Sequence, residues 1–170
     1  MKNIVLTGFM GTGKTTIGRV LAKLLGRNLI DVDSEIEKAQ GMRITEIFAT
    51  QGEAKFRDME TEMAGKISNL SNVVISTGGG IVLRQENIEL LRKNGIVVNL
   101  TAAPDVIHAR ISGGNDRPLL NVPDPLAKIR ELLEFRQPFY LNADIVIDTA
   151  DKTPILVAEE IIQSAKLMSR

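Results

Sequence analysis

The segment GFMGTGKT, which runs from Gly8 to Thr15, decides how this chain folds. It fits the pattern G-x-x-x-x-G-K-[ST], with the apolar run Asn3–Leu6 before it and an amphipathic helical pattern after it. In that context the glycines let the backbone curl so that its N–H groups point at phosphate oxygens, near the positive end of the following helix. We therefore predict a nucleoside-triphosphate site in which Lys14 reaches the β- and γ-phosphates and the Thr15 hydroxyl binds Mg²⁺. The residues expected to bind the nucleotide here are Gly11, Thr12, Gly13, Lys14, Thr15 and Thr16.

The composition of the chain excludes several other classes of protein. Its 170 residues, 44% of them hydrophobic and 25% charged, suit one soluble domain that spans residues 1–170. The 21 basic and 21 acidic residues cancel, which gives no support for a nucleic-acid or membrane-surface binder. The absence of cysteine excludes disulfides, thiolate nucleophiles and zinc–cysteine sites, and the single histidine, His108, is expected to be structural or on the surface. Because the chain starts directly with MKNIVLTGF and has no apolar run of transmembrane length, we expect a cytoplasmic protein, and we expect it to be a monomer.

Short apolar runs that alternate with helical patterns predict a parallel sheet covered by helices on both faces. The candidate strands are Asn3–Leu6, Leu29–Val32, Val73–Ser76, Ile96–Leu100 and Ile145–Ile147. The candidate helices are a segment from Lys14 to Gly26, short segments near Glu35–Ala39 and Thr45–Gln51, a longer one at about Glu53–Ser68, then Arg84–Lys93, Pro104–Ile111, Leu126–Phe135 and a last one that Thr153–Pro154 starts. The glycines, prolines and asparagines of Ser112–Pro125 are typical of a mobile loop, so we expect a lid at about residues 112–125.

Two aspartates, Asp31 and Asp33, stand at the end of the second predicted strand. In an extended strand this spacing places both carboxylates on the same side, at the sheet edge where ligands of doubly wound folds gather. Asp31 is then a candidate Mg²⁺ ligand, directly or through water, and Asp33 can meet an acceptor hydroxyl and take its proton. The alternative is that both aspartates are solvated turn residues or cap the helix that follows.

The phosphate-binding segment alone does not say what is done with the nucleotide. The chain has no N-K-x-D segment, which a GTPase would use to read the base. A small chain with an internal lid is typical of phosphoryl transfer to a small acceptor. The alternatives are a kinase for a nucleoside monophosphate or for gluconate, and a regulatory nucleotide-binding module without turnover.

Six segments, taken in order, point to one family. They are GFMGTGKTT at Gly8–Thr16, DVDSEIE at Asp31–Glu37, IFATQGEAKFRDME at Ile47–Glu60, ISTGGG at Ile75–Gly80, DRPLL at Asp116–Leu120 and RQPFYLNAD at Arg136–Asp144. In these segments the chain resembles the shikimate kinase family, from about Asn3 to about Pro154. The resemblance implies a three-layer α/β/α P-loop kinase fold with a five-stranded parallel sheet and a mobile lid. It also implies Mg²⁺-dependent transfer of the ATP γ-phosphate to the 3-hydroxyl of shikimate, on the pathway to chorismate and the aromatic amino acids.

The same resemblance implies roles for individual residues. The positions that match shikimate contacts are Asp33, Arg57, Gly79, Gly80 and Arg136. Asp31 matches the magnesium-associated acid, and Arg117 matches a lid arginine that approaches the phosphates. Arg110 and Pro154 match a pair of residues that flank adenine. The expected catalytic residues are therefore Lys14, Asp33 and Arg117.

The residue types at the implied shikimate-binding positions suit a small hydroxy acid. A carboxylate prefers the planar fork of a guanidinium, which Arg57 and Arg136 supply from distant parts of the chain. Glu60 follows Arg57 at i+3 and can hold that guanidinium in place, unless the two form an exposed surface pair. Without side chains at Gly78–Gly80, an acceptor ring can approach the backbone. We accordingly expect alanine at Gly79 to impair shikimate binding more than ATP binding.

Overall fold

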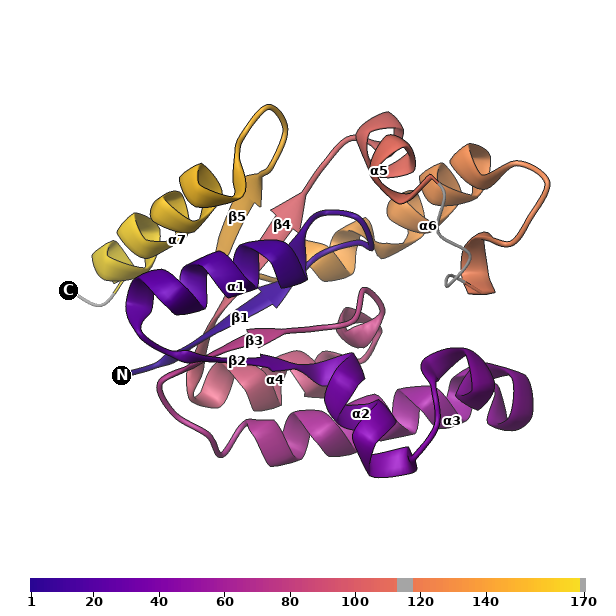
Figure 1. Ribbon diagram of the computed structural model, residues 1–170, viewed down its shortest axis with the longest axis horizontal. Helices are drawn as coiled ribbons and strands as arrows, with labels where there is room; N and C mark the ends of the chain where they lie inside the picture. The colour runs from indigo at the N-terminus through magenta and orange to yellow at the C-terminus, as the bar shows by residue number, and fades with distance from the viewer. Residues whose placement is uncertain (113–117, 169–170) are drawn as a thin grey trace.

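Five parallel strands form one sheet in the order β2-β3-β1-β4-β5, and helices lie on both of its faces (Figure 1). The computed structural model describes residues 1–112 and 118–168. The strands are β1 (Asn3–Thr7), β2 (Asn28–Asp31), β3 (Val73–Ser76), β4 (Gly95–Thr101) and β5 (Ile145–Asp148). The helices are α1 (Lys14–Leu25), α2 (Val32–Gln40), α3 (Ile44–Ile67), α4 (Gln85–Lys93), α5 (Pro104–Ile111), α6 (Pro125–Tyr140) and α7 (Pro154–Met168), with 3₁₀ turns η1 (Ile81–Leu83) and η2 (Pro118–Leu120). The predicted three-layer α/β/α fold with a five-stranded parallel sheet is confirmed.

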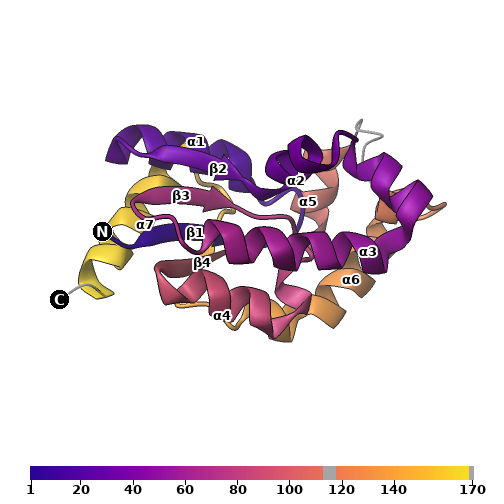
Figure 2. The same ribbon diagram turned by 90° about the horizontal axis from the view of Figure 1, so that it is seen from below.

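The two faces of the sheet bury separate hydrophobic cores, because successive side chains of a strand point in opposite directions. On β1, Val5 packs in the core with α3 and α4, whereas Ile4 and Leu6 pack in the core with α1 and α7. Strand β4 repeats the pattern, with Val97 in the first core and Val98 in the second. Figure 2 shows α1 on one side of the strands and α4 on the other, with α3 beside α4. The strands are apolar almost throughout because both of their faces are covered.

Helix α3 joins two segments that were predicted as separate helices, Thr45–Gln51 and Glu53–Ser68. The chain changes direction between them at Gly52, which has φ +83° and ψ 167°. Residues with a side chain rarely adopt this backbone conformation, so glycine is the residue that permits the kink. The predicted break therefore lies at the right residue, and α3 consists of two helical segments that meet at Gly52.

Helix α6 continues past its predicted end at Phe135, through Pro138, to Tyr140. A proline inside a helix removes one backbone hydrogen bond and costs about 3 kcal/mol. The last turn of α6 carries the buried side chains of Arg136 and Tyr140, and packing of the Tyr140 ring in the hydrophobic core helps to offset the cost of the proline. The extension matters because it carries both side chains to the site described below.

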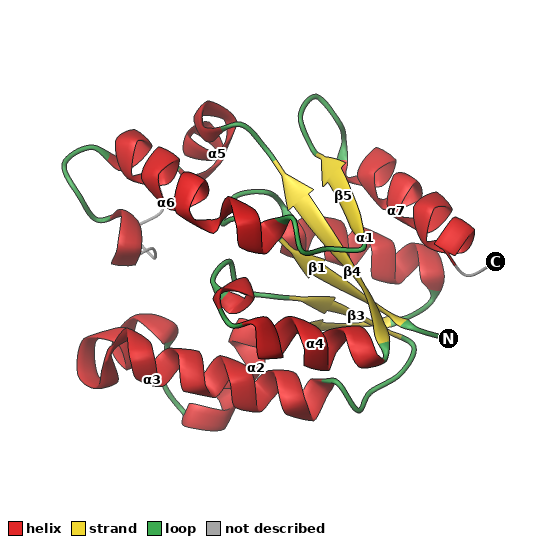
Figure 3. Cartoon of the chain, turned by 180° about the vertical axis from the view of Figure 1, so that it is seen from behind, coloured by secondary structure: helices red, strands yellow, loops and turns green. Residues whose placement is uncertain are grey.

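The carboxyl ends of β1, β2 and β3 meet at one edge of the sheet. Ser76 at the end of β3 lies in register with Leu6 of β1 and with Asp31 of β2. The phosphate-binding segment follows β1, α2 follows β2, and the glycines of ISTGGG follow β3, so these three segments converge. Figure 3 shows η1, which follows the glycines, between α3 on one side and α6 on the other.

Candidate active site

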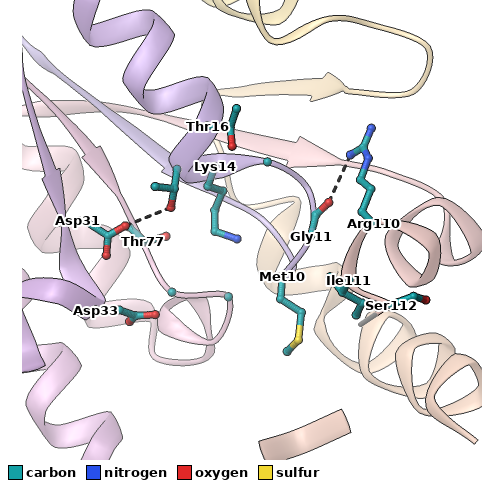
Figure 4. Close-up of a pocket in the computed structure, with 14 residues that line it drawn as sticks. Met10, Gly11, Lys14, Thr16, Asp31, Asp33, Thr77, Arg110, Ile111 and Ser112 are labelled. Carbon is teal, nitrogen blue, oxygen red and sulfur yellow. Dashed lines mark hydrogen bonds between the residues drawn. The ribbon is translucent and has the colours of Figure 1, made fainter. Parts of the chain in front are cut away.

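A pocket of about 620 Å³, called the larger pocket below, lies at the glycine-rich segment between β1 and α1 (Figure 4). Lys14 begins α1, and its Nζ donates to the carbonyl oxygens of Gly8 and Phe9 at 2.8 and 2.9 Å. The ammonium thus lies beside the positive end of α1, where anions are stabilised. The volume suits a nucleotide, since small-molecule pockets measure about 300–1,000 Å³. The pocket is lined by Met10, Gly11, Gly13, Lys14, Thr15, Thr16, Asp31, Asp33, Thr77, Gly78, Gly79, Arg110, Ile111 and Ser112.

Thr12 is the one predicted residue of the phosphate-binding segment that does not line this pocket. Its side chain is buried, and its Oγ1 donates to the carbonyl oxygen of Phe9 at 2.7 Å. The hydroxyl therefore holds the segment together from behind, and the Thr12 side chain is turned away from the space in which a phosphate would lie.

Three oxygen-bearing side chains meet where the first turn of α1 faces the ends of β2 and β3. The Thr15 Oγ1 donates to Asp31 Oδ2 at 3.1 Å and lies 3.3 Å from Ser76 Oγ. Mg²⁺ prefers oxygen ligands and completes its shell with water and substrate phosphates, so this donor set fits the predicted ion. In residues 1–112 and 118–168 no group of three or more His, Cys, Asp or Glu side chains could hold a metal alone. An ion beside Thr15 and Asp31 would therefore depend on phosphate oxygens as well.

The two aspartates are not arranged as predicted. Strand β2 ends at Asp31 and α2 begins at Val32, so the expectation that both carboxylates lie along one extended strand is wrong. The reason is that Asp31 caps α2: its Oδ1 accepts from the backbone N–H of Ser34 at 3.1 Å, which favours helix over strand at this point. Asp33 lies in the first turn of α2, and both carboxylates nevertheless face the larger pocket (Figure 4).

Asp33 lies in an environment that favours its protonated form. Burial and the neighbouring Asp31 raise the pKa of Asp33 to about 6, and Lys14 and Arg57 oppose the shift. The Asp33 Oδ1 is buried and accepts no hydrogen bond within the described residues. A carboxylate with a pKa nearer to neutrality is a more effective proton acceptor at physiological pH than an ordinary aspartate.

A second pocket of about 120 Å³, called the smaller pocket below, adjoins the first. It is lined by Met10, Asp33, Ile44, Phe48, Phe56, Arg57, Glu60, Gly78, Gly79, Gly80, Leu119 and Arg136. Four of these residues also line the larger pocket, namely Met10, Asp33, Gly78 and Gly79. Asp33 therefore lies at the boundary between a space that suits a nucleotide and a space that suits only a small molecule.

The smaller pocket gathers buried polar atoms that have no partner. Within the described residues, five buried side-chain atoms lack a hydrogen bond, and four of them belong to residues that line this pocket. They are Asp33 Oδ1, Glu60 Oε1, Arg57 Nε and Arg136 Nε, two acceptors and two donors. Native proteins leave few such atoms unsatisfied, so their concentration here indicates a ligand that carries both hydrogen-bond donors and an anionic acceptor.

Arg57 and Glu60 form a buried ion pair, and the surface alternative for this pair is excluded. Arg57 Nη1 donates to Glu60 Oε2 at 2.6 Å, and the two side chains are 10% and 0% exposed. Arg57 Nη2 also donates to Glu53 at 3.0 Å, and the guanidinium lies 5.4 Å from the centre of the Phe56 ring. Burial raises the pKa of Glu60 to about 7, although Arg57 acts to lower it. The guanidinium is thus fixed from several sides.

Arg136 reaches the smaller pocket from α6 and is nearly fully buried. Its guanidinium carbon lies 5.7 Å from the centre of the Phe9 ring. One turn later, the Tyr140 hydroxyl donates to the carbonyl oxygen of Gly79 at 2.7 Å. Phe9 and Tyr140 were not predicted as site residues. The signal for Tyr140 was its i+4 spacing from Arg136, which places both side chains on one face of a helix.

Each of the three glycines after β3 faces a different neighbour. A Cβ on Gly80 would overlap the Arg57 guanidinium, with Cζ and Nη2 both 2.5 Å away. A Cβ on Gly79 would lie 3.3 Å from the backbone nitrogen of Met10, and one on Gly78 would lie 2.8 Å from Asp33 Oδ1. The close approach to Arg57 thus occurs at Gly80, whereas Gly79 lies nearest to the phosphate-binding segment.

Of the remaining residues singled out from the sequence, only some line a pocket. Arg110 lines the larger pocket, donating to the carbonyl oxygen of Gly11 at 3.3 Å (Figure 4) and to Thr149 Oγ1 at 3.0 Å. Pro154 begins α7, is exposed and does not line the larger pocket. Arg117 lies outside the described residues. His108 lies on α5 and lines neither pocket.

Sequence and structure comparisons match this chain over most of its length to shikimate kinases. A sequence model of the family described as shikimate kinase matches residues 10–166. The chain is 56% identical over 164 residues to a shikimate kinase of Caldanaerobacter subterraneus subsp. tengcongensis, with 96% of each chain covered. It is 51% identical over 169 residues to a shikimate kinase of Thermodesulfovibrio yellowstonii, with 99% of this chain and 98% of the other covered.

Among solved structures, the shikimate kinase from Acinetobacter baumannii in complex with shikimate superimposes with a TM-score of 0.95 at 39% identity. The alignment covers 100% of this chain and 95% of the other. Similarity of this degree extends over nearly the whole length of each protein. The chain therefore belongs to the shikimate kinase family.

Proposed function

We propose that this chain transfers the γ-phosphoryl group of ATP to the 3-hydroxyl of shikimate, using the larger pocket for ATP and the smaller pocket for shikimate. The product is shikimate 3-phosphate, on the pathway to chorismate and the aromatic amino acids. The single observation that carries the assignment is the set of unpartnered atoms in the smaller pocket. A hydroxy acid of one small ring matches them, because its carboxylate accepts from arginine and its hydroxyls donate to carboxylates.

On the donor side, the positive end of α1 and the backbone of Gly11 and Gly13 attract the phosphates. Lys14 stabilises the charge that builds up on the γ-phosphoryl group, as a cation placed at the transferring group does in other phosphoryl-transfer enzymes. Arg110 lies at the rim beside Gly11, where we place the nucleoside end of ATP. Arg117, in the segment 112–125 that we expect to close over the site, is assigned to the same phosphates.

We assign the Mg²⁺ ion of the reaction to the oxygens of Thr15 and Asp31, which lie 3.1 Å apart. When bound, the ion neutralises charge on the β- and γ-phosphates of ATP. Asp31 performs this role while its other carboxylate oxygen caps α2, so the helix start keeps the ligand in a fixed orientation.

On the acceptor side, Arg57 of α3 and Arg136 of α6, which both line the smaller pocket, bind the carboxylate of shikimate. Each hydrogen bond to a charged group contributes about 1.5–3 kcal/mol, so two guanidinium groups suffice for a small acid. Asp33 receives the proton of the 3-hydroxyl, whose oxygen forms the new bond to the γ-phosphorus while the bond from that phosphorus to the bridging oxygen of ADP breaks. The pKa of Asp33, raised by burial to about 6, suits this transfer.

The acceptor is tested by a coupled assay of ADP production with ATP, Mg²⁺ and a panel of shikimate, gluconate, AMP and CMP. Shikimate is expected to be the preferred acceptor, because the smaller pocket has about 120 Å³ and does not hold a nucleoside. Preference for AMP or gluconate would refute the assignment, and ATP binding without turnover of any acceptor would favour a regulatory module.

The proposal includes a cytoplasmic monomer, as the sequence suggested. In the part of the chain that the structure describes, no helix has the length and apolar character required to cross a membrane. Size-exclusion chromatography with light scattering tests the monomer directly, and a mass of twice 18.6 kDa would contradict it.

A further inference from the structure

The segment Gly78–Gly80 has no side chains, so other groups must hold its backbone in place. The carbonyl oxygen of Gly78 accepts from the N–H of Ile81 at 3.3 Å, and that of Gly80 accepts from the N–H of Leu83 at 3.1 Å. Both bonds belong to the turn that opens η1. The carbonyl oxygen of Gly79 is held instead from α6, by the Tyr140 hydroxyl at 2.7 Å.

The hydrogen bond from Tyr140 to the Gly79 carbonyl fixes the whole Gly79–Gly80 peptide group, because a peptide unit is planar. The carbonyl of Gly79 and the N–H of Gly80 belong to the same peptide group, and a trans peptide points them in opposite directions. The chain has no cis peptide in its described residues. A hydroxyl that anchors the Gly79 carbonyl therefore turns the Gly80 N–H away from Tyr140. Gly80 lines the smaller pocket and Tyr140 does not.

Tyr140 also connects this peptide group to the arginine on the same helix. The guanidinium of Arg136, one turn earlier on α6, interacts with the Tyr140 hydroxyl and acts to lower its pKa. The Arg136 Nη1 lies 3.7 Å from the position that a Cβ on Gly79 would occupy. The hydroxyl is buried, and burial raises the pKa of Tyr140, so it remains a protonated donor to Gly79. The Tyr140 hydroxyl thus lies between the segment Gly78–Gly80 and Arg136.

We propose that Tyr140 is a positioning residue of the acceptor site, whose hydroxyl orients the Gly79–Gly80 peptide and sets its distance from Arg136. The proposal rests on the proposed function, in which these groups bind shikimate. Without the hydroxyl, the glycine dihedral angles are soft and the peptide can rotate. The Gly80 N–H would then be lost as a fixed donor to the substrate, while the phosphate-binding segment would keep its own hydrogen bonds.

The alternative is that Tyr140 serves only the hydrophobic core, in which its ring is packed. Tyr140→Phe separates the two roles, because it keeps the ring and removes only the oxygen. We expect the KM for shikimate to rise about three- to tenfold, the loss expected for one buried hydrogen bond, with the KM for ATP within about twofold of wild type. A purely structural role predicts a lower melting temperature and no such difference between the two substrates.

A matched control is Ser68→Ala. The Ser68 Oγ donates to the carbonyl oxygen of Gly65 at 2.8 Å, so this variant also loses one hydroxyl-to-carbonyl bond, at the end of α3 and outside both pockets. Both KM values should stay at the wild-type level. Equal changes in both KM values of Tyr140→Phe, or no change in either, would overturn the proposal.

Calorimetric titration with shikimate alone, well below the melting temperature of the variant, gives an answer even if Tyr140→Phe is less stable. An unaltered dissociation constant in that titration would also overturn the proposal. A failure of the proposed function is seen separately, because wild-type protein would then not phosphorylate shikimate at all.

Discussion

Replacing Gly80 by alanine should weaken shikimate binding far more than ATP binding, because the new methyl group would overlap the guanidinium of Arg57. A Cβ on Gly80 would lie 2.5 Å from both Cζ and Nη2 of Arg57. Ordinary contact between such atoms begins near 3.5 Å, so the guanidinium would have to retreat by about an ångström. It cannot do so freely, since Glu60 and Glu53 hold it by hydrogen bonds of 2.6 and 3.0 Å.

The size of the effect follows from the hydrogen bonds that a displaced Arg57 would lose. One charge-assisted bond to the shikimate carboxylate is worth about 1.5–3 kcal/mol, which corresponds to an increase of about 10- to 150-fold in the shikimate KM. The KM for ATP should change by less than about threefold, because Arg57 does not line the larger pocket. Steady-state kinetics with each substrate varied in turn measures both numbers.

Two other glycines serve as controls for this variant. Nothing lies within 4 Å of a Cβ on Gly65, so Gly65→Ala should leave both KM values unchanged and, in a helix interior, stabilise the fold by up to about 1 kcal/mol. Gly79→Ala would press on the backbone of Met10 at 3.3 Å and should disturb ATP as well as shikimate, contrary to the expectation from sequence. Two outcomes would contradict the idea that Gly80 and Arg57 together form part of the shikimate site. In the first, Gly80→Ala raises the KM for shikimate and the KM for ATP equally. In the second, the KM for shikimate stays within twofold of the wild-type value.

Three further predictions concern single charges. Lys14→Ala should lower kcat by about 10²–10³ while the melting temperature stays near wild type, and near-normal turnover would remove Lys14 from the phosphate site. Asp31→Asn keeps an N-cap for α2 but loses the charge next to Thr15, so the Mg²⁺ concentration for half-maximal activity should rise; an unchanged requirement would place the ion elsewhere. The pKa of Glu60 is raised by burial from 4.5 to about 7, so its protonated form stabilises the fold at low pH and that contribution is lost as pH rises through this interval. Unfolding free energies measured from pH 4 to 8 should therefore fall more steeply for wild type than for Glu60→Gln, and parallel curves would contradict the raised pKa.

Much of the fold was predictable because its signals are local. Glycine favours a break and proline favours a helix start through their own backbone geometry, so the kink at Gly52 and the start of α7 at Pro154 were placed correctly. The errors have the same local origin. From sequence alone, Asp31 fits the end of a strand as well as a helix cap, and Pro138 predicts the end of a helix. Tertiary packing determines that Asp31 caps α2 and that α6 continues through Pro138.

The sequence by itself determined the phosphate-binding segment, because its spacing of glycines, lysine and threonine encodes a backbone conformation that needs no distant partner. Through the resemblance to a known family it also led to the proposal that Asp33, Arg57 and Arg136 bind the acceptor. Only the tertiary structure decided how these groups combine, because burial and contact depend on segments far apart in the chain. The Tyr140 hydroxyl meets Gly79 across 61 residues, the pKa of Asp33 is raised by its surroundings, and two arginines and two carboxylates share one small pocket.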